Sequence, residues 1–212
     1  QRYAGPLLHS EDMLVISEKV VSITQQRAYP ISQIEPSWLA CVLAEFVHKS
    51  PYGIGLGSPW TMELAIREAG LLRVTAAAAV AGVARLFGAR GVFYRVCGCN
   101  VAAIDGPCDY TLPPYNRYAI LGPSEPDEVA ESVSRATGAP VAIIDANDLG
   151  VTVLGISSGC PECAFLAEVL ADNPLGQSCE QTPIGIVRPA RYVPHRGGAV
   201  TLRRSSGGWR KC

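Results

Sequence analysis

Two aspartates that follow apolar runs are the first candidates for chemistry in this chain of 212 residues. Asp105 comes directly after the apolar residues 101–104, and Asp145 comes directly after residues 141–144. We predict that both runs are neighbouring core strands, and polar side chains at the carboxyl ends of strands face the crevices where α/β proteins bind ligands. The sequence therefore predicts that the two carboxylates lie within about 10 Å of each other, close enough to share a cation.

Further oxygen ligands follow each of these two aspartates. Asp109 lies just after Asp105, and Asn147 and Asp148 lie just after Asp145. Hard cations such as Mg²⁺ and Mn²⁺ take oxygen ligands, and they usually bind through one or two carboxylates together with substrate phosphates. The alternative is that these side chains only form Asx turns, in which they hydrogen-bond the nearby backbone. Spacing alone leaves both interpretations open.

Two polar or glycine-rich loops could also bind a ligand. Residues 172–183 form a dense polar stretch that includes Gln177 and Glu180, and such a loop is either a ligand site or an ordinary hydrophilic connector. Residues 51–59 are rich in glycine and proline, but no strand precedes them and they do not match a phosphate-binding loop motif. We therefore interpret residues 51–59 as a plain loop.

Eight cysteines and three histidines give little support for other chemistry. Cys97 and Cys99 would face one side of a strand, and with Cys160 and Cys163 they could supply four thiolates for zinc. This spacing matches no familiar zinc pattern, so we predict free thiols and no zinc cluster. No histidine lies beside a recognisable serine or cysteine nucleophile motif, which argues against a catalytic triad.

Composition limits the class of protein. Hydrophobic residues make up 48% and charged residues 17%, which excludes a disordered chain, a collagen and a coiled coil. The net charge of -1 argues against general nucleic-acid binding. Residues 71–87 are the most membrane-like stretch, but their uncharged centre is shorter than the roughly 20 residues that a membrane span needs. We predict a buried helix there and no membrane partner.

Hydrophobic periodicity predicts the elements that must position the candidate residues. The clearest helix is 125–137, with Ser124 and Asp127 in the manner of a capping box and Gly138 at the end. The mixture of predicted helices and strands indicates an α+β or mixed α/β fold, with a mixed sheet and flanking helices. The other predicted helices are 36–49, 59–69, 71–87 and 161–172, with a short helix or turn at 19–27 and an extended loop at 110–116; the other predicted strands are 13–17, 92–96, 118–121, 151–156 and 183–187.

We predict one domain over residues 1–188, followed by a basic tail. Residues 189–212 contain no acidic residue and six lysines and arginines. Such a tail is either a solvated end or a segment that contacts phosphate or bridges subunits.

The segments at 12–27, 101–109, 141–150 and 175–189 contain Lys19, Asp105, Asp145 and Arg188, and in their residues and their order they resemble the coenzyme F-420-0:L-glutamate ligase (gamma-glutamyl ligase) family. The first, DMLVISEKVVSITQQR at 12–27, is similar to the opening motif of the family, with Ser17, Lys19, Val21, Ser22 and Arg27 in register. The second and third, VAAIDGPCD at 101–109 and VAIIDANDLG at 141–150, align Asp105 and Asp145 with aspartates of the family. The fourth, LGQSCEQTPIGIVRP at 175–189, is similar to the last motif and aligns Gly176, Glu180, Pro183 and Arg188.

The resemblance implies a GTP-dependent amide ligase with a mixed α/β fold, a cytoplasmic homodimer that acts on small molecules. Such enzymes activate a carboxylate of the deazaflavin precursor as an acyl phosphate, which the amine of L-glutamate then attacks. The resemblance implies Mg²⁺ or Mn²⁺ as cofactor and GTP as co-substrate. It implies catalytic roles for Lys19, Asp105 and Asp145, metal binding by Asp105, Asp109, Asp145 and Asp148, and nucleotide or substrate binding by Ser22, Asn147, Gln177, Glu180 and Arg188.

The chain departs from the family pattern after Asp145. Ala146 replaces a threonine, Asn147 and Asp148 replace a Gly-Arg pair, and residues 151–163 cross a gap that holds a long insertion in the family. These departures leave a second hypothesis open: a ligand-binding or assembly relative that kept the fold and lost the chemistry.

Overall fold

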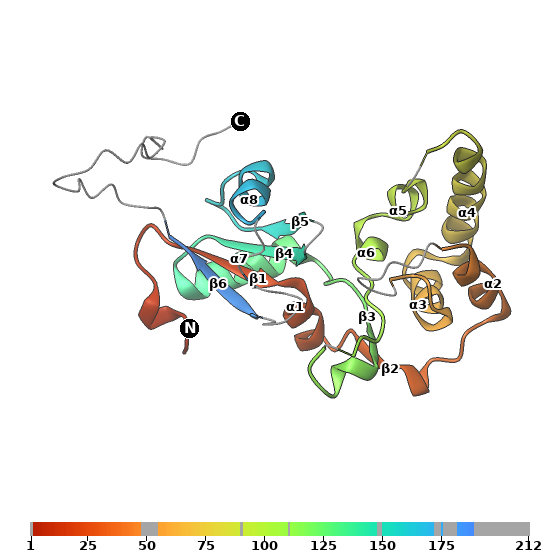
Figure 1. Cartoon of the computed structure of the whole chain (residues 1–212). Helices are drawn as coiled ribbons and strands as arrows, with labels where there is room; N and C mark the ends of the chain where they lie inside the picture. The colour runs from red at the N-terminus through yellow and green to blue at the C-terminus, as the bar shows by residue number, and fades with distance from the viewer. Residues whose placement is uncertain are drawn as a thin grey trace, which may run out of the picture. The chain divides into compact units, whose positions relative to one another are not determined.

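The computed structural model describes residues 2–47, 55–89, 91–109, 111–147, 150–171, 175 and 182–188 (Figure 1). These residues form two compact units. The sheet unit contains residues 2–16, 126–147, 150–171, 175 and 182–188, and the helical unit contains residues 17–47, 55–89, 91–109 and 111–125. The predicted domain 1–188 thus contains two units, and the predicted tail lies outside the described residues.

The sheet unit is built on four strands in the order β5-β4-β1-β6. The strands are β1 (Met13–Ser17), β4 (Val141–Asn147), β5 (Gly150–Ile156) and β6 (Ile184–Val187), and the predictions at 13–17, 151–156 and 183–187 are confirmed. β1 pairs antiparallel with β6, and β4 pairs antiparallel with β5. Met13, Val15, Ile144 and Leu166 are buried in its core. The mixed sheet and its flanking helices confirm the predicted fold class.

β4 is longer than predicted, and this changes the setting of Asp145. The sequence predicts that the strand ends at Ile144, but pairing with β5 continues through Asp145 opposite Thr152 to Asn147 opposite Gly150. Ile144 and Ala146 are buried, and Asp145 between them is half-buried. Because alternate side chains of a strand face opposite sides, an aspartate can interrupt an apolar run without ending the strand.

α7 (Pro126–Thr137) packs on β4 and β5, and its extent agrees with the predicted helix 125–137. The predicted capping box is wrong in its contacts. The carboxylate of Asp127 accepts the N–H of Ile156 at 2.8 Å, and the N–H of Ser124 donates to the Gln25 side chain at 2.8 Å. α8 (Cys163–Val169), which packs on β5, is shorter than the predicted 161–172, and the unit begins with a 3₁₀ turn, η1 (Gly5–Leu7).

The helical unit has six helices and a small antiparallel sheet of two strands within its described residues. Its core includes Leu56, Met62, Val101 and Ile104. The elements are α1 (Glu18–Thr24), β2 (Ala28–Pro30), η2 (Ile31–Gln33), α2 (Trp38–Phe46), α3 (Pro59–Ala69), α4 (Leu71–Leu86), α5 (Val92–Cys97), α6 (Cys99–Ala102), η3 (Tyr115–Arg117) and β3 (Tyr118–Ile120).

Two predicted strands of this unit are wrong. Residues 92–96 belong to the helix α5, bounded by Gly91 and Gly98, whose positive φ angles of 70° and 98° suit glycine. An apolar run of this length fits a buried strand or a buried helix equally well, and here packing against the helical core decides. Residues 101–104 end α6 and enter a turn, and Asp105 then forms an isolated bridge with Ile120.

Other helical predictions hold only in part. α2 begins at Trp38, later than the predicted 36–49, because the Ser37 hydroxyl caps it by accepting the N–H of Ala40 at 3.3 Å. It ends at Phe46, and residues 48 and 49 lie outside the described residues. α3 and α4 match their predicted extents. The expected burial of α4 is wrong, because only Val74 and Ala77 are buried in it. η3 replaces the end of the extended loop predicted at 110–116.

No single helix among the described residues is long and apolar enough to cross a membrane. Only α3 and α4 together are long and apolar enough, and a bend of 116° separates them.

Candidate active site

An ion pair joins two of the predicted catalytic residues. Nζ of Lys19 lies 2.6 Å from Oδ2 of Asp105 in the helical unit. Lys19 is in the first turn of α1, which begins as soon as β1 ends. Asp105 is fixed by two backbone hydrogen bonds with Ile120 of 2.9 Å each. Two segments far apart in the sequence thus bring a lysine and an aspartate into contact.

The ion pair is accessible from outside. The side chains of Lys19 and Asp105 are 32% and 45% exposed, so a charged ligand could reach either group. Ser22 lies three positions after Lys19 on α1, and residues with this spacing are neighbours on a helix surface. The Ser22 hydroxyl is buried and makes no hydrogen bond to the described part of the chain. Lys19 and Asp105 therefore offer an ammonium and a carboxylate to a ligand, whereas the Ser22 hydroxyl, one helical turn from Lys19, is buried.

Arg27 anchors the segment that follows α1. Its Nε donates to the carbonyl of Gly122 at 2.7 Å, and its Nη2 pairs with Glu68 at 2.6 Å. The carbonyl of Arg27 accepts the N–H of Leu121 at 3.0 Å. Arg27 is one of the motif residues, and its contacts tie the end of the α1 segment to α3 and to the residues after β3. It thereby supports the elements that carry Lys19 and Asp105.

Two further contacts complete this support. The side-chain amide of Gln25 exchanges two hydrogen bonds of 2.8 Å with the backbone of Ser124. A Cβ at Gly122 would lie 2.9 Å from the Cβ of Ala103 and 3.1 Å from the carbonyl oxygen of Asn100. These approaches leave no room for a side chain at position 122. A glycine there therefore allows the residues after β3 to pack on the segment that leads to Asp105.

Arg188 has a different setting, in the sheet unit. Its guanidinium donates to both carboxylate oxygens of Asp12, at 2.8 and 2.7 Å, and to the carbonyl of Leu7 at 2.9 Å. Asp12 is buried and also accepts the N–H of His9 at 2.7 Å. The bonds from Arg188 hold the pKa of Asp12 well below its usual range. The described contacts of Arg188 are structural, and its predicted contact with nucleotide or substrate stays a prediction.

The other predicted ligands are only partly described. Asp109 is exposed in a turn, and Asp145 is half-buried in β4. The Asn147 side chain, Asp148, Gln177 and Glu180 lie outside the described residues. Asp105 and Asp145 belong to different units, so their predicted convergence stays a prediction.

The described residues contain no group of three or more His, Cys, Asp or Glu side chains placed to hold a metal ion. The half-exposed carboxylate of Asp105 and the exposed one of Asp109 nevertheless fit Mg²⁺ or Mn²⁺, because such cations need few protein ligands when phosphate and water supply the rest.

The cysteines are not arranged as the strand interpretation assumed. Cys97 ends α5, Cys99 begins α6, and Gly98 lies between them with a φ of 98°. Cys97, Cys160 and Cys163 are free thiols, and burial raises the pKa of both Cys97 and Cys160. The thiol of Cys160 donates to the carbonyl of Val141 at 3.0 Å. The prediction that no zinc cluster forms awaits a metal analysis.

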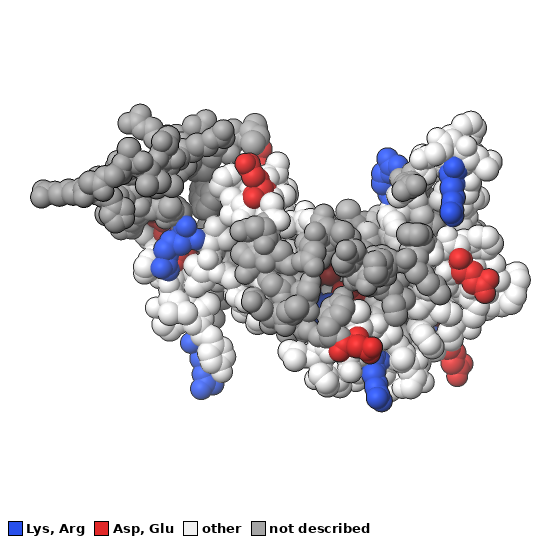
Figure 2. Space-filling view, in the orientation of Figure 1, with Lys and Arg blue, Asp and Glu red and all other residues white. Residues whose placement is uncertain are grey.

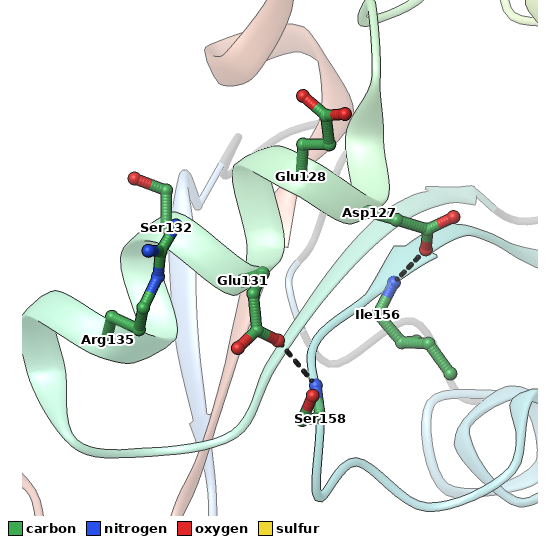
Figure 3. A pocket seen from close by; sticks show the side chains of 7 residues that line it. All are labelled: Asp127, Glu128, Glu131, Ser132, Arg135, Ile156 and Ser158. Carbon is green, nitrogen blue, oxygen red and sulfur yellow. Dashed lines mark hydrogen bonds between the residues drawn. The ribbon is translucent and has the colours of Figure 1, made fainter.

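The sequence did not reveal an open depression of about 740 Å³ beside α7 (Figure 3). Two of its carboxylates bind backbone N–H groups at the end of β5: Asp127 that of Ile156 and Glu131 that of Ser158, each at 2.8 Å. The bond from Ser158 lowers the pKa of Glu131. These acids hold α7 to the sheet, and their spacing of four residues was the only sequence signal. The residues that line the depression are Asp127, Glu128, Glu131, Ser132, Arg135, Ile156 and Ser158.

Comparison with known proteins gives one family. A model of the F420-0:Gamma-glutamyl ligase family matches residues 2–148, more than half of the chain. The match includes Lys19, Asp105 and Asp145. A search of curated proteins gave no match.

Proposed function

Because the chain belongs to the F420-0:gamma-glutamyl ligase family, we propose that it is a GTP- and divalent-metal-dependent amide ligase. It joins L-glutamate, or another amine, to a carboxylate such as that of coenzyme F420-0. The observation that carries this proposal is the accessible Lys19–Asp105 ion pair inside the matched region. An ammonium and a carboxylate at one surface suit a reaction whose reactants are phosphates and carboxylates.

The reaction has two steps. In the first, an oxygen of the substrate carboxylate attacks the γ-phosphorus of GTP. The bond from that phosphorus to the bridging oxygen breaks, GDP leaves, and an acyl phosphate forms. In the second, the amine nitrogen of glutamate attacks the acyl carbon, the carbon–oxygen bond to phosphate breaks, and inorganic phosphate leaves. The nitrogen loses a proton to solvent, and the product is an amide.

Lys19 supplies positive charge for these phosphates. A lysine ammonium is a compact charge on a flexible stem, which suits contact with phosphate oxygens. Asp105 holds that ammonium at 2.6 Å and is itself fixed by two backbone bonds to Ile120. The pair is therefore positioned before a ligand binds, which reduces the reorganisation that phosphoryl transfer would need. Ser22 and, by resemblance, Asn147, Gln177, Glu180 and Arg188 are proposed to contact nucleotide or substrate.

Asp105 and Asp109 are the described carboxylates of the helical unit that we propose as metal ligands. We propose Asp145 and Asp148 as ligands on the resemblance alone. A bound Mg²⁺ or Mn²⁺ would neutralise phosphate charge during transfer. Asp105 and Asp109 offer carboxylate oxygens, which is the donor type that Mg²⁺ and Mn²⁺ take.

One observation favours a second candidate function. β4, which contains Asp145, and β5 form a hairpin with only residues 148 and 149 between the two strands. The resemblance places a long insertion after this hairpin position, and the chain lacks it. A relative that binds the ligands without joining them is therefore the alternative.

Thermal unfolding and product analysis test the proposal together. With GTP and Mg²⁺ at millimolar concentration the melting temperature of the full chain should rise, because a ligand that binds only the native state stabilises it. Incubation with F420-0 and L-glutamate should release GDP and give a product heavier by one glutamyl residue in mass spectrometry. Nucleotide binding without GDP release would favour the ligand-binding relative. A folded chain that does not respond to GTP, ATP or GDP would overturn the ligase proposal and favour an assembly relative that kept the fold and lost the chemistry.

Asp105→Asn is the variant that ties this test to the site. It should abolish the Mg²⁺-dependent effect of GTP while the apo protein stays folded. Glu128→Gln on α7 is the matched control, because it also removes one exposed carboxylate and should leave the GTP effect unchanged.

A further inference from the structure

The small sheet of the helical unit has two different faces. Ala119 is buried in the helical core, so its neighbours on β3, Tyr118 and Ile120, point to the opposite face. Asp105 joins that opposite face, because it exchanges two hydrogen bonds of 2.9 Å with Ile120 and directly paired residues point to the same side. We define the site face as the face that carries Asp105, Tyr118 and Ile120.

Tyr118 lies close to the ion pair on the site face. Lys19 reaches this face from α1, which contacts β3, and its Nζ lies 2.6 Å from Oδ2 of Asp105. Tyr118 is two positions from Ile120, so it is a diagonal neighbour of Asp105. Diagonal neighbours of an antiparallel pair are about 7–8 Å apart, which is within reach of an aromatic side chain. An aromatic ring therefore lies beside the proposed reaction site.

Two neighbours hold the ring of Tyr118 in place. Tyr115 of η3 packs edge to face with it, with 5.3 Å between the ring centroids and 63° between the ring planes. Pro30 of β2 is the cross-strand partner of Tyr118 on the same face of the small sheet. Both tyrosines are half-buried. A ring that is already ordered and still partly exposed loses little conformational entropy when a ligand stacks on it.

The surface near this ring favours no sign of charge. In Figure 2 the lower surface of the helical unit, around η3 and β2, is white apart from red and blue groups that lie side by side. Beside Tyr118, Ile120 is buried and pairs with Ala28 of β2. A ring on a largely uncharged surface, next to an ammonium and a carboxylate, suits a ligand with a planar ring at one end and charged groups at the other.

We propose that Tyr118, held by Tyr115, stacks on the planar heteroaromatic ring of a ligand whose phosphate or carboxylate end lies at Lys19 and Asp105. This inference rests on the proposed function, which supplies two such ligands: the deazaflavin precursor and the guanine nucleotide. Tyr118 then determines specificity and is not a catalytic residue, because it binds the ring and does not touch the reacting atoms.

Two probes that carry a ring but neither phosphate nor carboxylate test the stacking without any reaction. They are guanosine and the ribityl deazaflavin, and ligand-observed NMR on the full chain at about 1 mM probe detects millimolar binding. The folded wild type should bind one of them through its ring protons. Binding of the deazaflavin assigns the ring to the precursor, and binding of guanosine assigns it to the nucleotide. Binding of neither probe would overturn the proposal.

Variants of Tyr118 test the residue. Tyr118→Leu should raise the Kd of the bound probe at least about fivefold, because it removes one stacking platform. Tyr118→Phe keeps the ring and should bind like the wild type. Tyr29→Leu is the matched control, because Tyr29 pairs with Ala119 on the other face, and its Kd should not change. Unchanged binding in Tyr118→Leu, or an equal loss in Tyr118→Phe, would overturn the stacking.

Circular dichroism separates ring binding from a purely structural role of Tyr118. A Tyr118→Leu chain that is less stable but binds the probe like the wild type would show that the ring only packs the small sheet, and this would overturn the proposal. If Tyr118→Leu does not fold, Tyr115→Leu replaces it. That variant releases the ring of Tyr118 and should weaken probe binding about two- to tenfold.

Kinetics of the ligase reaction separate this inference from the proposed function. Tyr118→Leu should raise the KM of the substrate that carries the ring at least about fivefold and leave kcat and the KM of L-glutamate unchanged. GDP release with no such change in KM would overturn the stacking and leave the proposed function in place. Probe binding that depends on Tyr118 in a chain without GDP release would support the stacking and favour the ligand-binding relative.

Discussion

The two units use ion pairs in different ways. In the helical unit, Nζ of Lys19 lies 2.6 Å from Oδ2 of Asp105, and both side chains are partly exposed. In the sheet unit, Arg188 makes two bonds to Asp12, whose side chain is fully buried, and a third to the carbonyl of Leu7. All four residues lie in segments that resemble family motifs. Similarity to a motif therefore does not distinguish a residue that can meet a ligand from one that holds the fold.

The burial of the acidic partner makes that distinction, because the Asp12 side chain is fully buried and that of Asp105 is 45% exposed, whereas Arg188 itself is 48% exposed. A buried carboxylate needs its partners, because an unpaired charge is costly away from water. An exposed ion pair contributes little to stability and leaves its groups accessible to a ligand. We therefore expect the helical-unit pair to affect activity and the sheet-unit pair to affect stability.

The largest expected effect is on activity. Asp105→Asn removes the carboxylate that holds Lys19, and it should reduce GDP release at least about 100-fold, in line with the loss of preorganised charge stabilisation. The apo melting temperature should hardly change. A variant that loses activity only because it unfolds would contradict this assignment, and circular dichroism of the apo protein separates the two cases.

Packing of α7 on the sheet should give the largest stability effect. A Cβ at Gly155 would lie 2.4 Å from the carbonyl carbon of Pro126 and 2.7 Å from the nitrogen of Asp127. Gly155→Ala should lower the free energy of unfolding by about 1–3 kcal/mol, the usual effect of overpacking. Urea denaturation measures it. Gly5→Ala, where a Cβ would meet nothing within 4 Å, is the control.

Asp12→Asn should lower the melting temperature by several degrees, because Arg188 loses its charged partner. The effect should depend on pH. Arg188 lowers the pKa of Asp12 in the folded state, so the stabilisation is fully present above the ordinary pKa of about 3.9 and is lost as the pH falls towards the lowered value. Melting curves between pH 6 and pH 2.5 should therefore show the wild type and the variant converging in acid. A difference in melting temperature between the wild type and the variant that stays constant with pH would contradict the ion-pair explanation.

Lys19→Gln should give the smallest stability effect. The exposed pair with Asp105 contributes at most about 0.5 kcal/mol to the free energy of unfolding, because water screens it and ordering two side chains has an entropic cost. Urea denaturation at low and high salt measures this. A loss of several kcal/mol would show that Lys19 is structural, and the contrast between the two units would fail.

Local pattern determined several parts of this protein. Alternating and continuous apolar runs predicted β1, β5 and β6, and an amphipathic stripe predicted α7, because these signals depend on neighbours a few positions away. The ordered motifs identified the family and selected Lys19 and Asp105 as candidate site residues. The glycine at position 70 separated the two predicted helices, and the predicted ranges match α3 and α4 almost to the residue.

Only the tertiary structure decided which residues meet. Residues 92–97 form a helix because core packing favours it, although the same run suits a strand. α4 is as apolar as a buried helix, but the described chain covers only the side that carries Val74 and Ala77. The pairing of Lys19 with Asp105 and of Arg188 with Asp12 joins residues far apart in sequence. No local pattern encodes such contacts, because the position of each partner depends on how the whole unit folds.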